Sequence, residues 1–299
     1  MITTPTVLIL GAGASKPYHF PLGSELITLV SSQHAIRYFD QAREHFEMIN
    51  ADWRAFKTAI QNAQPPSVDD FLEERQEHEK IGRLCIAGAL MPCEHRAKTQ
   101  MFEAGQGSRH WYRELWHLMS APFEEFQENK LSIVTFNYDR SLEHYLFTAL
   151  KSRFKKSDTE CAEKLADKVI HVYGQLGCLP WQASEVTQMV PFGEASPDNI
   201  RHAADGIQIM HIAEETSDEF ECARKVIAGA KRVLFLGFGF HATNMKRLGF
   251  TPPCENPPGL DLYGTFVGLP LREQRMGTKM GIKPLHPSAC LSVAFISPC

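Results

Sequence analysis

A glycine-rich segment near the start of this 299-residue chain has residue types that suit nucleotide binding. Gly11, Ala12, Gly13, Ala14 and Ser15 directly follow an apolar run. Glycines at such a turn let backbone N–H groups come close to a diphosphate, and the N-terminus of a following helix favours the same negative charge. A tight structural turn explains this segment as well as a phosphate site does.

The segment departs from the usual dinucleotide-binding fingerprint. Lys16 stands where the third glycine is expected, and no acidic residue marks the end of a second strand about twenty residues later. A phosphate-binding loop of the Gly-Lys-Ser/Thr type is also missing from the sequence. The glycine segment therefore needs support from other parts of the chain.

That support begins with the segment TFNYD, which follows another apolar run. Asn137 offers a donor and an acceptor that can hold a water or a ribose hydroxyl, and Asp139 can accept hydrogen bonds from hydroxyls. The structural alternative is that both residues cap the helix beginning near Arg140, and for Asp139 this alternative is favoured.

Two later segments are also apolar runs that end in residues able to contribute to a site. His171 closes an apolar run in HVYG, and a histidine with a pKa near neutrality can act as a general base. A lone histidine on an apolar strand is more often a satisfied core residue. Gly237 lies in LGFGF, a further run that ends in a glycine-spaced turn.

The elements that must position these segments are short buried strands separated by helical intervals. This pattern predicts βα units and an α/β fold, a doubly wound, Rossmann-like parallel sheet whose carboxyl edge binds ligands. The predicted strands are Thr6–Leu10, Leu131–Thr135, Val169–Tyr173, Arg232–Leu236, Leu262–Val267 and Leu291–Ile296, with Ile207–His211 as a weaker candidate.

About 120 residues separate the first two predicted strands, far more than a βα crossover needs, and their pattern is helical. Apolar residues from Phe39 to Ile60 recur in steps of three and four, which places them on one helix face. Pro65 ends that helix, Ser67 begins the next, and helices are also expected at Ile81–Leu90 and Trp111–Phe126. We interpret residues 31–128 as a helical insertion within a single domain spanning 1–299.

Composition excludes several classes of protein. The net charge of −4 disfavours direct binding to nucleic acid, and no apolar run approaches the roughly 20 residues of a membrane span. The start of the chain has no basic region typical of a signal peptide, so a cytoplasmic protein is expected. None of the eight cysteines forms a Cys-x-x-Cys pair, so most are expected to be reduced structural thiols.

In this order, GAGAS, TFNYD, HVYG and LGFGF resemble the sirtuin-like family, named for the NAD-dependent protein deacetylases. PFGE (191–194) is similar to the segment that borders the sirtuin peptide groove. Three further segments resemble a bacterial branch with many NAD-degrading effectors of anti-phage defence: FPLGSEL (20–26), SVDDFL (67–72) and WYRELW (111–116).

Departures from the deacetylases favour the NAD-cleaving branch. Deacetylases usually carry two Cys-x-x-Cys pairs between the histidine strand and Phe-Gly-Glu, whereas here about twenty residues separate His171 from Phe192, with Cys178 alone between them. Phe136 and Tyr138 also replace the glutamine and isoleucine of the deacetylase motif. The zinc-bearing small domain is thus expected to be replaced by the helical insertion.

The resemblance implies an NAD⁺ glycohydrolase that releases nicotinamide and ADP-ribose, with NAD as substrate and no metal. It assigns Asn137 to position the water or ribose hydroxyl and His171 to act as general base. The glycine segment would hold the diphosphate, Asp139 the ribose or the nicotinamide side, and Gly237 would lie near the adenosine half. The alternatives are an NAD- or ADP-ribose-binding regulatory module without turnover and, third, an NAD-dependent protein deacylase.

An unrestrained NAD hydrolase would harm its own cell, so activity is expected to depend on assembly or a trigger. Relatives often act beside a second protein such as a ring-forming ATPase, and the expectation is a homo-oligomer with a separate partner. The apolar face from Phe39 to Ile60 is a candidate association surface, with packing inside the chain as the commoner alternative.

Overall fold

The computed structural model describes residues 1–39, 43–103, 110–183, 188–209, 217–250 and 259–285, with the backbone alone at 43–48. Its centre is a six-stranded sheet in the order β3-β2-β1-β4-β5-β6, and every neighbouring pair of strands is parallel. This is the order of a doubly wound, Rossmann-like sheet. The strands are β1 (Thr6–Leu10), β2 (Leu131–Thr135), β3 (Val169–His171), β4 (Arg232–Leu236), β5 (Asp261–Thr265) and β6 (Lys283–Leu285).

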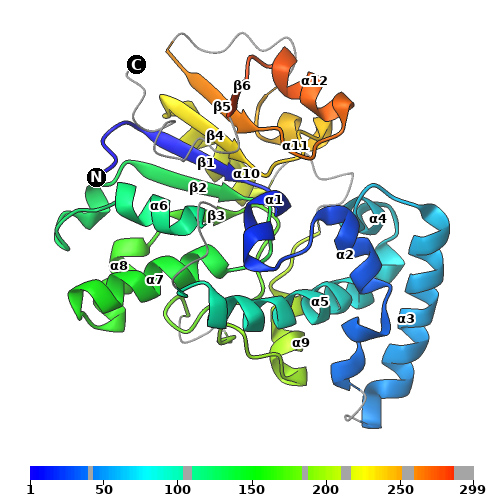
Figure 1. Ribbon diagram of the computed structural model, residues 1–299. Helices are drawn as coiled ribbons and strands as arrows, with labels where there is room; N and C mark the ends of the chain where they lie inside the picture. Colours follow the sequence, from blue (N-terminus) through cyan, green and yellow to red (C-terminus); the bar gives the residue numbers. More distant parts are fainter. Residues whose placement is uncertain (40–42, 104–109, 184–187, 210–216, 251–258, 286–299) are drawn as a thin grey trace.

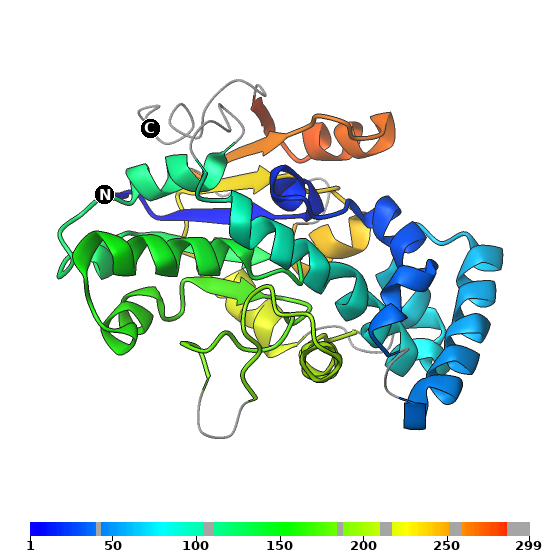
Figure 2. The same cartoon turned by 60° about the horizontal axis from the view of Figure 1, so that its bottom comes forward.

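Helices cover both faces of the sheet, with α6 and α7 on one face and α10 on the other (Figure 1). A lobe formed by α2 to α5 lies beyond the carboxyl ends of the strands, and Figure 2 shows it projecting to one side of the sheet. The helices are α1 (Ala12–Ser15), α2 (Gly23–Val30), α3 (Arg43–Ala63), α4 (Val68–Glu74), α5 (Glu79–Gln100), α6 (Trp111–Leu118), α7 (Ser141–Phe154), α8 (Asp158–Leu165), α9 (Pro197–Asp205), α10 (Asp218–Ala228), α11 (Ala242–Arg247) and α12 (Leu271–Lys279). Short 3-10 helices include η2 (Gln33–Ala35) and η3 (Arg37–Phe39).

The central strands form because their sequences are apolar without interruption. Every residue of β1 and β4 is buried, as expected for parallel strands covered by helices on both faces. The predicted bounds of β1, β2 and β4 are confirmed. Since β1 lies between β2 and β4, the chain leaves β1 toward one edge of the sheet and later returns to its other side. That reversal places the usual ligand crevice at the carboxyl ends of β1 and β4.

The interval between β1 and β2 is helical, as the sequence pattern predicts. Helix α3 continues through Asn50 and Asp52 and ends just before the two prolines. Ser67 caps α4: its Oγ accepts from the Asp70 N–H at 3.0 Å. On the apolar face of α3, Trp53, Phe56 and Ile60 are buried within the chain, which favours packing inside the chain for these three side chains.

Other predictions differ from the structure. The helix expected to reach Phe126 ends at Leu118, and Pro122 a few residues later prevents the helix from continuing to Phe126. Helix α5 is longer than predicted, β3 ends at His171 and β5 spans Asp261–Thr265.

Three further strand assignments also change. Residue Ile207 forms an isolated antiparallel bridge with Gly174 instead of a strand. Strand β6 was not predicted, because Lys283–Leu285 is short and mostly exposed and contains a proline. The predicted strand at 291–296 lies outside the described residues.

Candidate functional site

The four predicted segments meet at the carboxyl edge of the sheet. In the strand register, Leu10 lies opposite Thr135 on one side and Leu236 on the other, and Thr135 lies opposite His171. The residues that follow these strand ends are therefore neighbours. The predicted gathering of GAGAS, TFNYD, HVYG and LGFGF at one edge is confirmed.

The glycines of the first turn let it pack directly against the turn after β4. A Cβ on Gly11 would lie 2.6 Å from the Gly237 carbonyl oxygen, and one on Gly13 would lie 2.7 Å from the Gly237 Cα. Gly237 has a φ of +56°, and a Cβ there would lie 2.1 Å from the Ala14 nitrogen. Any larger residue at these positions would push the two turns apart.

Several backbone donors of these turns are already used within the protein. The N–H groups of Gly11, Gly13 and Ala14 donate to Leu236, Gly237 and Gly11 carbonyls, respectively, at 2.9–3.0 Å. The Gly237 N–H donates to Thr265 Oγ1 at 2.8 Å. These groups can donate to a diphosphate only after the turns rearrange, so the glycines here first serve close backbone packing.

Asn137 joins the second segment to the glycine turn. Its Nδ2 donates to the Gly11 carbonyl and to Ser15 Oγ, each at 3.0 Å, and its backbone N–H donates to Thr135 Oγ1 at 3.1 Å. The side chain is half-buried. Because both contacts use the amide nitrogen, the amide oxygen is left to accept from a water or hydroxyl.

Asp139 lies at the centre of a buried hydrogen-bond network. Its Oδ2 accepts from Ser15 Oγ at 2.7 Å, and its Oδ1 accepts from the Ser141 N–H at 3.1 Å and from the Ser141 hydroxyl. Tyr112 Oη lies 2.6 Å from Ser141 Oγ. Burial raises the pKa of Asp139 above its ordinary value, while the hydroxyl donors oppose that shift. Asp139 thus accepts the N–H of Ser141, the first residue of α7, and also anchors the glycine turn through Ser15.

His171 is held on both sides of its ring. Nδ1 lies 2.9 Å from the Asn137 carbonyl oxygen, and Nε2 lies 2.5 Å from Glu143 Oε1. The His171 side chain is 8% exposed and the Glu143 side chain is 4% exposed. Burial lowers the pKa of His171, but the Glu143 carboxylate and the hydrogen bonds outweigh it and leave the pKa raised. Both neighbours are acceptors, so this arrangement suits the imidazolium ion.

Helix α6 also contacts the glycine segment, at Ala14. Trp111 Nε1 donates to the Ala14 carbonyl at 2.8 Å, and the Tyr112 N–H donates to Tyr18 Oη at 2.9 Å. The rings of Tyr18 and Tyr112 stack at 3.7 Å. Ala14 is buried and Ala12 is half-buried. The WYRELW segment thus supports the glycine turn directly.

A buried ion pair links the site to the helical lobe. Arg140 donates to Glu94 Oε2 at 2.6 Å and to Oε1 at 3.0 Å, and both side chains have no exposed area. Arg140 also donates to the Val190 carbonyl at 2.6 Å, while Glu94 accepts from the Gly193 N–H at 3.2 Å. The pair therefore joins α5, the start of α7 and the PFGE segment.

A second polar network links α4 to the strand ends. The Tyr138 hydroxyl donates to Asp69, and burial raises the pKa of that carboxyl to about 6. Arg247 donates to Tyr173 Oη at 2.6 Å and to Glu73 Oε1 at 3.0 Å. Residues of SVDDFL and α11 thus contact the side chains that follow β2 and β3.

Sequence reasoning missed Glu143, Ser141, Glu94 and Arg140. Glu143 stands in the first turn of α7, where a carboxylate is explained by the helix dipole alone. Glu94 lies in the middle of a long helix, 46 residues from its partner Arg140. Local sequence carries no signal for either contact.

Within the described ranges, no helix is long and apolar enough to cross a bilayer. The same part of the chain contains no group of three or more His, Cys, Asp or Glu side chains able to hold a metal ion.

Comparison of the sequence with protein-family models gives no match, and comparison with curated proteins gives no significant match. The resemblance to sirtuin-like proteins thus rests on the four ordered segments and the additional motifs. The function is therefore argued from the arrangement of these residues.

Proposed function

We propose that the protein is an NAD⁺ glycohydrolase with a sirtuin-like domain in which residues 31–128 form a helical insertion. One observation carries this proposal: the glycine turn, Asn137, Asp139 and His171 meet at the reversal point of the parallel sheet. Dinucleotides bind at that point in doubly wound folds. The order of the four segments along the chain, which resembles that of the sirtuin-like family, also supports the proposal.

The reaction consumes one water. The bond between nicotinamide nitrogen and the ribose C1′ breaks with its electron pair on nicotinamide, a water oxygen bonds to C1′, and one proton is released. Positive charge grows on the ribose as the bond breaks, so nearby oxygen acceptors stabilise the transition state. NAD⁺ carries a cationic leaving group, which needs no proton to depart.

Asn137 is the residue proposed to position the water or a ribose hydroxyl through its amide oxygen. Its amide nitrogen is fixed by Gly11 and Ser15, and that fixes the direction of the oxygen. His171 is proposed as the acceptor of the released proton. It must first lose a proton and one ring contact, because both ring nitrogens already have partners.

Glu143 completes this proposal as a positioning residue. Its carboxylate holds the His171 ring and favours its charged form. The paired state is then a resting state, and ligand binding must break the contact between His171 and Asn137 or Glu143 before the ring can take a proton. Dependence of activity on assembly or a trigger fits such a resting state.

A second function, binding of NAD or ADP-ribose without turnover, is favoured by one specific observation. Several polar groups of the site are engaged within the protein, namely the N–H groups of Gly11, Gly13, Ala14 and Gly237, the Asp139 carboxylate and both His171 nitrogens. A site that keeps these contacts can bind a nucleotide but has no free base. The two functions share the glycine turn and differ in whether nicotinamide is released.

By the same resemblance, the proposed setting is bacterial anti-phage defence, in the cytoplasm. There the protein acts as a homo-oligomer with a separate partner such as a ring-forming ATPase. This setting is tested separately from the chemistry, by light scattering with and without NAD and with the protein encoded beside it. A monomer in every condition would contradict the oligomer.

The decisive experiment incubates the purified protein with NAD⁺, with and without the neighbouring protein, and follows nicotinamide release by chromatography. Wild type is expected to release nicotinamide, and Asn137→Ala and His171→Gln to lose at least about 100-fold in rate, the scale of one lost polar transition-state contact or acid–base group. Gln at 171 keeps a donor facing Glu143. Asn62→Ala and His117→Ala, both on exposed helix positions, serve as matched controls.

Two results would change the conclusion. Calorimetric NAD binding with no nicotinamide release in any condition would establish the binding module instead. An active wild type with unaffected Asn137→Ala and His171→Gln variants would refute the site assignment while leaving the activity in place.

A further inference from the structure

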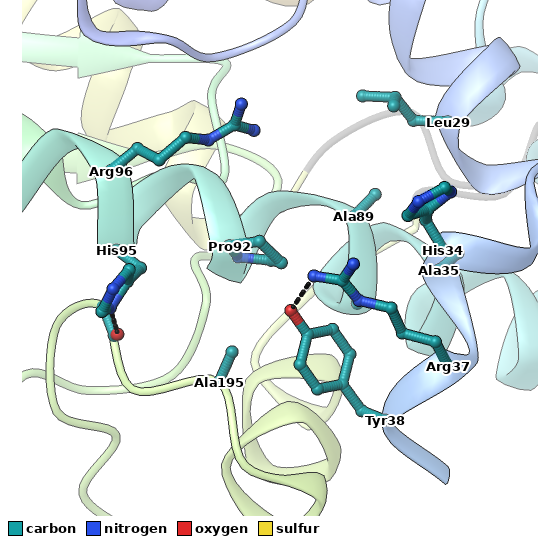
Figure 3. Close-up of a pocket in the computed structure, with 12 residues that line it drawn as sticks. Leu29, His34, Ala35, Arg37, Tyr38, Ala89, Pro92, His95, Arg96 and Ala195 are labelled. Atoms are coloured by element: carbon teal, nitrogen blue, oxygen red, sulfur yellow. Dashed lines mark hydrogen bonds between the residues drawn. The ribbon is translucent and has the colours of Figure 1, made fainter. Parts of the chain in front are cut away.

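A cavity of about 660 Å³ lies in the helical lobe, away from the strand ends. Its walls come from the end of α2 with η2 and η3, from α5, and from Gly193 in PFGE with Ala195 just after it (Figure 3). Gly88 lets η2 approach α5 closely: a Cβ there would lie 2.0 Å from the Ala35 carbonyl oxygen. The cavity is therefore formed by tight backbone packing between elements far apart in the sequence.

The charged residues that line this cavity are all basic or histidine. They are His34, Arg37, His95 and Arg96, and the lining contains no Asp or Glu among the described residues. Figure 3 shows Arg37 and Arg96 on opposite sides of the cavity, with Ala89 and Pro92 between them. Positive charge from two separate elements thus faces one space.

Neither arginine is neutralised within the described part of the chain. Arg37 donates to Tyr38 Oη at 2.8 Å and lies over the Tyr38 ring at 4.9 Å, and Arg96 contacts Cys93 Sγ at 3.5 Å. No described carboxylate forms an ion pair with either one. Both residues are exposed and line the cavity, so each retains guanidinium donors for a ligand.

The rest of the lining is apolar and includes Leu29, Ala35, Ala89, Pro92 and Ala195. A largely apolar cavity with a few convergent charged groups is the usual form of a small-molecule site. Guanidinium groups bind phosphate through paired, charge-assisted hydrogen bonds. The two features together favour a ligand with a phosphoryl group and an apolar body.

Elements around the cavity also contact parts of the chain near the candidate site. A neighbouring cavity of about 490 Å³ shares Leu29 and Arg96 with it and reaches Lys16, next to the glycine turn. On the other side, His95 Nδ1 lies 3.1 Å from the Gly193 carbonyl oxygen, and Gly193 contacts Glu94, the partner of Arg140. A ligand here would contact elements that hold the candidate site in place.

We propose that this cavity binds a small organic phosphate, with the phosphate charge balanced by Arg37 and Arg96 from two sides of the cavity and the apolar body against Leu29, Ala89 and Pro92. The site is separate from the glycine turn. Its occupancy does not depend on whether the protein cleaves NAD.

Isothermal titration of the full chain with AMP tests this proposal, with adenosine and inorganic phosphate as matched probes. AMP is expected to bind, and adenosine and phosphate each to bind at least about tenfold more weakly, because each lacks one half of the recognised chemistry. Arg37→Gln and Arg96→Gln are each expected to weaken AMP binding about tenfold, the scale of one lost charge-assisted hydrogen bond. Arg54→Gln, an exposed arginine on α3, is the control and should bind as wild type does.

The two arginine variants distinguish this cavity from the candidate NAD site, because both arginines line the cavity and neither belongs to the strand-end segments. Three results would overturn the proposal: no binding of AMP, adenosine binding as tightly as AMP, or AMP binding that the two arginine variants leave unchanged. NAD cleavage is read in a separate assay, so its failure would not affect this outcome.

Discussion

The strand-end site and the basic cavity differ in how their polar groups are satisfied. At the strand ends, Asp139 and His171 have partners within the protein on every side. In the cavity, Arg37 and Arg96 face an opening without a described carboxylate. The first region must exchange internal contacts for a ligand, whereas the second is formed in advance. Mutations at the strand ends should therefore lower the free energy of unfolding. Mutations of the cavity arginines should weaken ligand binding and leave the free energy of unfolding nearly unchanged.

The largest effect is expected where the two regions are joined, at Glu94. Glu94→Leu leaves Arg140 buried without its counter-charge, and breaking a fully buried pair typically costs about 3–5 kcal/mol of unfolding free energy. Urea denaturation followed by circular dichroism measures it. Asp158→Asn breaks an exposed pair with Lys151 and should leave the midpoint unchanged. A similar small effect for Glu94→Leu would show that the ion pair does not hold the regions together.

A slightly smaller effect is expected for the contact between the two glycine turns. Gly237→Ala combines a left-handed φ of +56° with a Cβ placed against Ala14, and should cost about 2–4 kcal/mol. Gly268→Ala is the matched control, since its φ is +74° but nothing lies within 4 Å of the added Cβ. Thermal unfolding of both variants separates backbone strain from the steric clash. Equal losses would mean that the close approach contributes nothing.

The charged pair at His171 should give a smaller and pH-dependent effect. Glu143→Gln removes the negative charge but keeps an acceptor, and should cost about 1.5–3 kcal/mol, the range for a hydrogen bond to a charged group. The folded pKa of His171 is raised, so this stabilisation is complete below the unfolded pKa and disappears as pH rises through the folded value.

Unfolding of wild type and Glu143→Gln at several pH values between about 5 and 9 tests the direction of this pH dependence. The difference in stability between the two proteins should shrink as pH increases. An NMR titration of His171 should place its pKa above the ordinary value in wild type and lower in the variant, because the Glu143 charge no longer opposes the effect of burial. A difference that grows with pH would refute a charged His171.

The smallest stability effect is expected in the cavity. Arg37→Gln and Arg96→Gln remove exposed charges without described carboxylate partners, so each should change the free energy of unfolding by less than about 0.5 kcal/mol. The same urea experiment measures this small change beside the large one expected for Glu94→Leu. Glu94 is next in sequence to His95, which lines the cavity. A loss above about 1 kcal/mol would show that the arginines serve the fold instead of a ligand.

Much of the fold was predictable because local patterns encode it. Thr6–Leu10 and Arg232–Leu236 are unbroken apolar runs, and Ser67 with Asp70 forms a cap from adjacent residues. Predictions failed where a short or mixed pattern depends on its neighbours. Strand β6 exists because β5 supplies its hydrogen-bond partners, and its own three residues carry no strand signal.

The candidate site was predicted in part. The positions of Asn137, Asp139 and His171 at one sheet edge followed from the strands before them, because parallel strands end together. Their partners did not follow. Glu143 and Ser15 reach them across the sheet edge, and the basic cavity brings together residues 37 and 96 from separate elements.

The sequence by itself determined the class of fold and which residue types stand at the strand ends, since hydrophobic runs and glycine turns are local properties. Only the tertiary structure decided which partners those residues contact. Whether the Asp139 carboxylate is free or bound by Ser15, and whether His171 is free or paired, depends on side chains distant in sequence that compete for the same hydrogen bonds. That competition is settled by packing, because each buried polar group must find its partner in the folded chain.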